Sequence, residues 1–151
     1  MSEIRSKLDP NNTLPIVQFR STPSSFTEVL DEDGYVIGNF TTIDKDGSTH
    51  FVTIELEDDE TIRGKGYGLA IYTQVIENTH ARGFTFESHP KIVSEKAKTI
   101  WDRFVREKLA QEIEPFKMAT YIDIEGQMQP HMSDGRPEYS GLYRIPPPEK
   151  T

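Results

Sequence analysis

A short glycine-rich segment between two different sequence patterns constrains the fold most strongly. Before it, residues 50–57 alternate partly between apolar and polar side chains, as a β-strand does. After it, residues 68–81 place apolar side chains at helical spacing, and Arg82-Gly83 ends that run. The segment consists of Arg63, Gly64, Lys65, Gly66, Tyr67 and Gly68. The order predicts a strand that leads through a tight glycine turn into the N-terminus of a helix.

Further strand-like runs surround this segment on both sides. The runs cover residues 16–19, 26–30, 35–43, 50–57, 84–87, 116–124 and 139–145. Acidic turns at residues 31–34 and 44–47 join three of the runs into an antiparallel meander. A second helix follows Ser94, a favourable capping residue, and its apolar side chains from Ala97 to Leu109 lie on one face. The pattern predicts a mixed sheet with helices on its faces, an α+β fold.

Length and composition limit the class of protein. The 151 residues suit one domain. Along the chain we expect a flexible arm (residues 1–15), a single folded domain (16–145) and a proline-rich tail (146–151). The absence of cysteine excludes disulfides, and the four histidines show no metal-ligand spacing, so we expect no metal. No apolar run is long enough to span a membrane. The formal net charge of -8 argues against nucleic-acid binding. These features favour a soluble, cytoplasmic protein.

The glycine segment has the chemistry of an anion-binding loop. Glycines allow the backbone to approach a phosphate closely, and the N-terminus of the following helix offers free N–H groups and partial positive charge. Arg63 and Lys65 can add charge for further phosphates. A P-loop would need Ser or Thr after Lys65, where Gly66 stands, and the glycine spacing also differs from that of dinucleotide folds. The alternative is an ordinary glycine turn with two solvated basic residues.

The segment resembles the signature of the GCN5-related N-acetyltransferases, Arg/Gln-x-x-Gly-x-Gly/Ala. Arg63, Gly66 and Gly68 occupy the defining positions. The resemblance continues into the second helix, where the family usually has Asn-x-x-Ala-x-x-Leu-Tyr. The corresponding residues are Ser94, Ala97, Ile100 and Trp101. The similarity is clear over residues 35–109 and weak at both ends.

This resemblance implies a fold, a cosubstrate and a reaction. The sheet should splay between the strands at residues 50–57 and 84–88, and the pantetheine arm of acetyl-CoA should lie in the splay. The pyrophosphate should rest on the amides from Lys65 to Gly68, with Arg63, Gly64 and Ser94 also in the cofactor site. The implied enzyme is an acyltransferase that moves an acetyl group to a primary amine on a small molecule or a protein. A homodimer is one candidate assembly.

Two departures from the family pattern stand out. The family places one or two helices between its first two strands, whereas residues 20–25 are too few for a helix. Its frequent tyrosine, which can protonate the leaving thiolate, falls on Trp101, and an indole cannot do so near neutral pH. Trp101 also lies on the apolar face of its helix, where it is most simply a core residue.

The catalytic residues are the least determined part of the prediction. A carboxylate is the expected base, because the acceptor amine must lose a proton. Glu57 is the favoured candidate among Glu55, Glu57, Asp58, Asp59 and Glu60, and the alternative is a solvated acidic run. The acid is Tyr121, Tyr139, Tyr143 or water. A non-catalytic CoA-binding module and a protein-interaction module remain alternatives on the same fold.

Overall fold

A computed structural model describes residues 3–149 of the chain and divides it into two units. The first unit comprises Met1–Phe86 and Pro147–Thr151, and the second comprises Glu87–Pro146. The sequence instead favoured one domain over residues 16–145. The boundary between the units falls inside a strand, β5 (Thr85–Glu87), where no linker composition marks it. The expected arm and tail include residues 1–2 and 150–151, which lie outside the described part of the chain.

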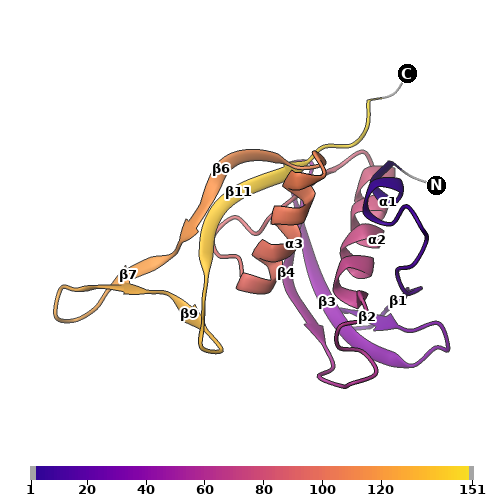
Figure 1. Cartoon of the computed structure of the whole chain (residues 1–151), viewed down its shortest axis with the longest axis horizontal. Coiled ribbons are helices and arrows are strands. Elements are labelled where there is room, and N and C mark those ends of the chain that lie inside the picture. Colours follow the sequence, from indigo (N-terminus) through magenta and orange to yellow (C-terminus); the bar gives the residue numbers. More distant parts are fainter. Residues whose placement is uncertain (1–2, 150–151) are drawn as a thin grey trace. The chain divides into compact units, whose positions relative to one another are not determined.

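Four antiparallel strands form the sheet of the first unit (Figure 1). They are β1 (Gln18–Ser21), β2 (Thr27–Leu30), β3 (Val36–Lys45) and β4 (Ser48–Leu56). The Asp31 carboxylate accepts hydrogen bonds from the amides of Asp33 and Tyr35, which forms the β2–β3 turn. The β3–β4 turn contains Asp46 and Gly47 with φ of 52° and 81°, a backbone shape that short hairpin turns require. The predicted meander is therefore confirmed.

Helix α2 (Tyr67–Ala81) covers one face of this sheet (Figure 1). Its apolar face buries Ile71, Val75 and Ile76. The Tyr72 ring lies 4.7 Å from the ring of Phe51 on β4. Strand β5 follows α2 and pairs with β4 in parallel, as the strand–helix–strand order predicts. The core of the first unit therefore lies between α2 and the meander.

The N-terminal residues form part of this core, which differs from the flexible arm expected for residues 1–15. Residues Glu3–Leu8 form helix α1, and Ile4 and Leu8 are buried. An ion pair of 2.6 Å between Arg5 Nη2 and Glu77 Oε1 joins α1 to α2. The two buried residues are four positions apart and share a face of the helix. Six residues are too short a helix to give a clear periodic signal in the sequence.

The second unit pairs a long hairpin with one helix (Figure 1). Its main elements are α3 (Glu95–Arg106), β6 (Gln111–Met118) and β11 (Tyr139–Ile145). Four short strands occupy residues that the sequence assigned partly to one strand and partly to a loop. They are β7 (Thr120–Ile122), β8 (Met128–Pro130), β9 (Met132–Ser133) and β10 (Arg136–Pro137). Among the strands of residues 3–149, they pair only with one another, β7 with β8 and β9 with β10.

Aromatic side chains form the core of the second unit. Trp101 is buried against Phe104, with ring centroids 5.3 Å apart, and also meets Tyr143 at 6.2 Å. The Tyr143 ring stacks on Phe116 at 4.0 Å. These contacts place Trp101 where its apolar helix face suggested. The whole chain is an α+β fold with mainly antiparallel pairing, as predicted. Within residues 3–149, no helix is both long and apolar enough to cross a membrane.

Candidate functional site

The glycine segment forms a tight loop that ends at the first residue of α2. Gly64 and Gly66 have φ of 70° and 86°, left-handed conformations that glycine adopts without steric cost. Ahead of them, the Asp59 carbonyl accepts hydrogen bonds from the amides of Ile62 and Arg63, at 3.0 and 2.8 Å. Ile62 is buried and anchors the loop. The loop is therefore an ordered turn with a fixed backbone path.

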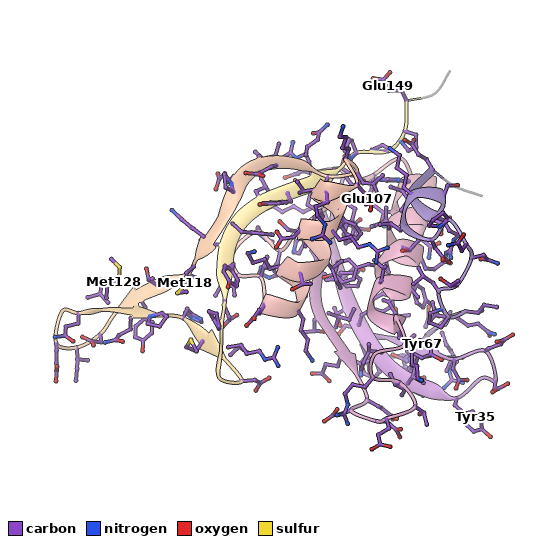
Figure 2. All side chains as sticks on the ribbon, viewed as in Figure 1. Tyr35, Tyr67, Glu107, Met118, Met128 and Glu149 are labelled. Carbon is purple, nitrogen blue, oxygen red and sulfur yellow. The ribbon has the colours of Figure 1, made fainter. Side chains whose placement is uncertain are left out.

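The start of α2 offers a set of free backbone donors. Gly66 is the N-cap residue, and no side chain caps the helix. Within the described chain, the amides of Gly66, Tyr67, Gly68 and Leu69 donate no hydrogen bond, and the first bond into the helix runs from Ala70. Figure 2 labels Tyr67 at this end of α2. Free donors at the positive end of a helix dipole bind anions. Of the four amides that the sequence assigned to a pyrophosphate, Lys65 to Gly68, the last three are free, whereas the Lys65 amide donates to the carbonyl of Ile62 at 3.4 Å.

One wall of this loop comes from a segment that sequence reasoning did not connect with the site. A Cβ added at Gly66 would lie 3.2 Å from Leu14 Cδ2 and 3.6 Å from Pro15 Cδ. The buried Asp9 carboxylate holds this segment in place, because it accepts hydrogen bonds from the amides of Thr13 (2.6 Å) and Leu14 (3.0 Å). Any residue larger than glycine at position 66 would therefore meet both backbone strain and a side-chain contact.

The two basic residues of the loop have different surroundings. Arg63 Nε lies 2.8 Å from Asp58 Oδ1, and both side chains are largely exposed. Lys65 is exposed and has no ion-pair partner among residues 3–149. Hydrogen bonds from the Thr61 backbone and side chain lower the pKa of Asp59, and this carboxyl is therefore charged at neutral pH. Acidic side chains therefore offset part of the positive charge that the loop would present to phosphates.

Strand β4 opens toward one side beyond its first residues. On β4, strand β5 pairs with only Ser48 and Thr49, so the described chain provides no partner on that side for residues 51–56. The register between β3 and β4 also shifts, since Thr41 pairs with Thr53 but Thr42 pairs with Phe51. Val52 is the extra residue of this β-bulge and has no partner on β3. A ligand with amide groups can hydrogen-bond to such an unpaired strand.

The candidate bases lie on and after this strand. Glu55 is in β4, opposite Asn39 of β3, and its side chain is exposed. Glu57 follows the end of β4, its amide donates to the carbonyl of Ile37 at 2.9 Å, and its side chain is also exposed. Ile54 and Leu56 are less exposed than Glu55, which agrees with the predicted alternation. Within the described part of the first unit, no contact selects one carboxylate over the other.

Ser94 belongs to the second unit. It is the N-cap of α3, and its hydroxyl accepts a hydrogen bond from the Ala97 amide at 3.2 Å. The predicted cap is confirmed. The three tyrosines considered as acids also lie in this unit: Tyr143 is buried, Tyr139 is partly exposed beneath Lys98, and Tyr121 is exposed. Over residues 3–149, no three His, Asp or Glu side chains form a group that could hold a metal.

Comparisons with known proteins find similarity in structure but not in sequence. No protein-family model matches the sequence. No curated protein matches it either. The structure, however, resembles the ribosomal-protein-S18-alanine N-acetyltransferase from Escherichia coli, with a TM-score of 0.52, 13% identity, and coverage of 83% of this chain and 70% of that one. It also resembles a spermidine/spermine N-acetyltransferase from Vibrio cholerae, with a TM-score of 0.50, 13% identity, and coverage of 80% and 64%.

These similarities identify the type of fold. A sheet that opens beside a strand, followed by a glycine loop and an uncapped helix, is an arrangement within an α+β fold. It is the fold of the GCN5-related N-acetyltransferase superfamily. At 13% identity the likeness concerns the fold alone.

Proposed function

We propose that this protein is an acetyl-CoA-dependent N-acetyltransferase that acts on a primary amine. The observation that carries the proposal is the row of free amides from Gly66 to Leu69, which follows in the chain the unpaired part of β4. The amides suit the pyrophosphate of acetyl-CoA, and the unpaired strand suits the amide groups of its pantetheine arm. Arg63, Gly64, Lys65, Tyr67 and Gly68 complete the proposed cofactor loop. Ser94 remains a candidate through its place in the signature.

The chemistry requires a proton acceptor and a polarised carbonyl. The amine nitrogen attacks the thioester carbon, the new C–N bond forms, and the C–S bond breaks to release CoA as a thiolate. A lysine-like amine has a pKa near 10.4, so losing its proton at pH 7 costs roughly 4–5 kcal/mol. Glu57 is the proposed acceptor of that proton, directly or through water. Backbone amides near the Val52 bulge are the proposed donors to the carbonyl oxygen.

The acceptor is proposed at the level of its chemistry. The net charge of -8 favours a cationic substrate over an anionic one. The two similar enzymes are named for acceptors of different size, a ribosomal protein and a polyamine, and both supply an amine. Either a small molecule or a protein therefore suits the proposal, and an amine panel with a free-thiol readout is the first search.

Calorimetric titration of acetyl-CoA into the whole chain tests the cofactor site. We expect binding, and we expect Gly66→Ala to weaken it at least about tenfold, because a Cβ would strain the loop and meet Leu14. Gly34→Ala is the matched control, since Gly34 has a nearly identical φ of 88° but no neighbour within 4 Å of its Cβ. Equal affinities for the two variants, or no binding by the unchanged protein, would contradict the proposal.

A non-catalytic CoA-binding module is the second candidate. Trp101 is a core residue at the position where the family usually has a tyrosine that acts as the general acid. In addition, only five residues separate β1 from β2, where the family has one or two helices. A module of this kind would bind acetyl-CoA tightly but release no free thiol with any amine. A protein-interaction module would bind no acetyl-CoA and gain no thermal stability from it. The titration and the amine panel together separate the three.

A further inference from the structure

The strand that runs from β6 into β7 has one edge that no other described strand covers. On the inner side, β11 pairs with β6 and β8 pairs with β7. Ala119 joins the two strands, and its amide donates to Glu138 O at 2.8 Å while its carbonyl accepts from His131 N at 2.7 Å. Both groups of one strand residue point to the same side. The partners of β6 and β7 therefore lie on one side, and the outer edge is open (Figure 1).

The residues whose backbone faces this outer edge follow from the alternation of an antiparallel ladder. Ala119 faces inward, and so does Asp123, whose amide donates to Gln127 O at 2.9 Å. Tyr121 lies midway between them and also faces inward. The N–H and C=O groups of Met118, Thr120 and Ile122 must then face outward. Pro130, the β8 residue opposite Thr120, has no N–H to give, which fits this assignment.

Only part of this edge is protected against pairing with another chain. Strand β6 contains Pro115, which lacks an N–H, and its pairing with β11 is interrupted by two register shifts. Both features discourage edge-to-edge association. From Met118 to Ile122 there is neither a proline nor a charged residue. Met118 and Ile122 are 49% and 64% exposed, and Figure 2 labels Met118 at the start of this stretch.

We propose that a second copy of this chain pairs with this edge, antiparallel and across a twofold axis at Thr120. In that register Thr120 lies opposite Thr120 of the second copy, and Met118 lies opposite Ile122. Every outward N–H and C=O of these three residues then meets a partner. One residue further along each strand, Lys117 of one copy lies opposite Asp123 of the other. The pairing satisfies backbone groups, covers two exposed apolar side chains on each copy, and joins opposite charges.

Self-complementarity is the reason to favour a second copy over an unrelated strand. The same short segment provides Met118 at one end and its apolar partner, Ile122, at the other. It likewise provides the basic Lys117 and the acidic Asp123. Asp123 is charged at neutral pH, because the Gln127 amide and the Gln129 side chain hydrogen-bond to it and lower its pKa. The same hydrogen bonds hold the β7–β8 turn in one conformation, so the edge is already shaped for pairing.

Single cysteines test the register directly, because the chain has none of its own. Thr120→Cys should form an intermolecular disulfide under mild oxidation, since residues opposite each other in a hydrogen-bonded pair have Cα atoms about 5.5 Å apart. Ile122→Cys should not, because the two copies of residue 122 would be roughly 14 Å apart. An equal mixture of the Met118→Cys and Ile122→Cys proteins should instead cross-link to each other. Equal cross-linking of all single variants would overturn the register.

Sedimentation velocity over a range of concentrations tests the association itself. We expect a monomer–dimer equilibrium, and we expect Ile122→Lys to raise its dissociation constant about tenfold or more, because each dimer would gain two unfavourable cross-strand contacts. Tyr35→Lys, which changes an exposed aromatic residue in the first unit, should leave the equilibrium unchanged. Circular dichroism and melting curves check that each variant is folded. A chain that stays monomeric at high micromolar concentration, or a dimer that Ile122→Lys does not weaken, would overturn the proposal.

Discussion

At the scale of single residues, Arg63 of the proposed cofactor loop already has an anionic partner, Asp58. The Arg63 Nε atom lies 2.8 Å from the Asp58 carboxylate, which would compete with a phosphate for the same guanidinium. Lys65 has no such competitor among the described residues. The two basic residues of the signature should therefore contribute differently to the binding of an anionic cosubstrate.

Replacing Asp58 should improve acetyl-CoA binding. Asp58→Asn removes a negative charge beside the proposed phosphate site and releases Arg63, so the dissociation constant should fall by about two- to fivefold, the usual scale for exposed charges. Added salt should reduce this gain by screening. Asp33→Asn makes the same change of charge in the exposed β2–β3 turn, outside the loop, and should have no effect. Calorimetry at two salt concentrations measures both variants, and weaker binding by Asp58→Asn would contradict the prediction.

The prediction about proton transfer concerns Glu57, the proposed base. Glu57→Gln keeps the shape of the side chain and removes its basicity, so folding and acetyl-CoA binding should survive. The acetylation rate at pH 7 should fall by about two to four orders of magnitude. The loss should be smaller at high pH, where more of the acceptor amine is already neutral. A Glu57→Gln protein with unchanged rates at pH 7, measured by thiol release, would transfer the role to Glu55 or to water.

At the scale of elements, the N-terminal segment is a structural part of the first unit. Burial alone would raise the pKa of Asp9, but hydrogen bonds from Leu14 and Thr13 outweigh burial and hold the pKa below its ordinary value of 3.8. A carboxyl with a depressed pKa in the folded state stabilises the fold at pH values above the unfolded pKa. That contribution is lost as the pH falls through the folded pKa.

The expected pH dependence of the Asp9→Asn variant follows from the direction of this pKa shift. The variant should melt at a lower temperature than the unchanged protein at pH 7, because the amide cannot replace the charged acceptor of these hydrogen bonds. The difference in melting temperature should shrink below about pH 4, where the unfolded carboxyl takes up its proton. Asp33→Asn, at an exposed turn, should show a smaller difference at every pH. A difference that grows on acidification would contradict the assignment.

The sequence predicted elements well where the periodic pattern was long or the end signals were strong. Strand β11 has the predicted bounds, α2 begins one residue earlier than predicted, and Ser94 caps α3 as expected. The strand expected over residues 116–124 is interrupted at Ala119, because β6 and β7 pair with different partners. Strands of two or three residues, such as β9, are too short to show a period in the sequence.

In the candidate site, too, local features were predictable from the sequence and long-range contacts were not. The glycine loop and its helix were predictable, because strand, loop and helix are continuous in the chain. The contact of Leu14 and Pro15 with Gly66 was not, since it joins residues about fifty positions apart. The Val52 bulge also has no local signal, because it depends on the register between β3 and β4. Contacts between distant segments need the fold itself.

At the scale of the whole molecule, the excess of acidic residues should influence the choice of acceptor. A formal net charge of -8 attracts cations and repels anions over distances longer than any single contact. A diamine should therefore have a lower KM than an amino acid of the same chain length. Added salt should raise the KM of the diamine, because screening removes the attraction. A monoamine of equal length is the control, and a diamine KM that salt does not change would contradict the prediction.

The uncapped start of α2 leaves the helix without a stabilising contact that many helices have. Asp or Ser at an N-cap normally accepts a backbone hydrogen bond, but at position 66 the left-handed backbone, with φ of 86°, and the contact with Leu14 would offset that gain. Mutational programmes that select this protein for thermal resistance should therefore leave Gly66 unchanged and find their gains elsewhere. The proposed ligand would itself supply the missing acceptor, so the protein should be hardiest when saturated with its cosubstrate.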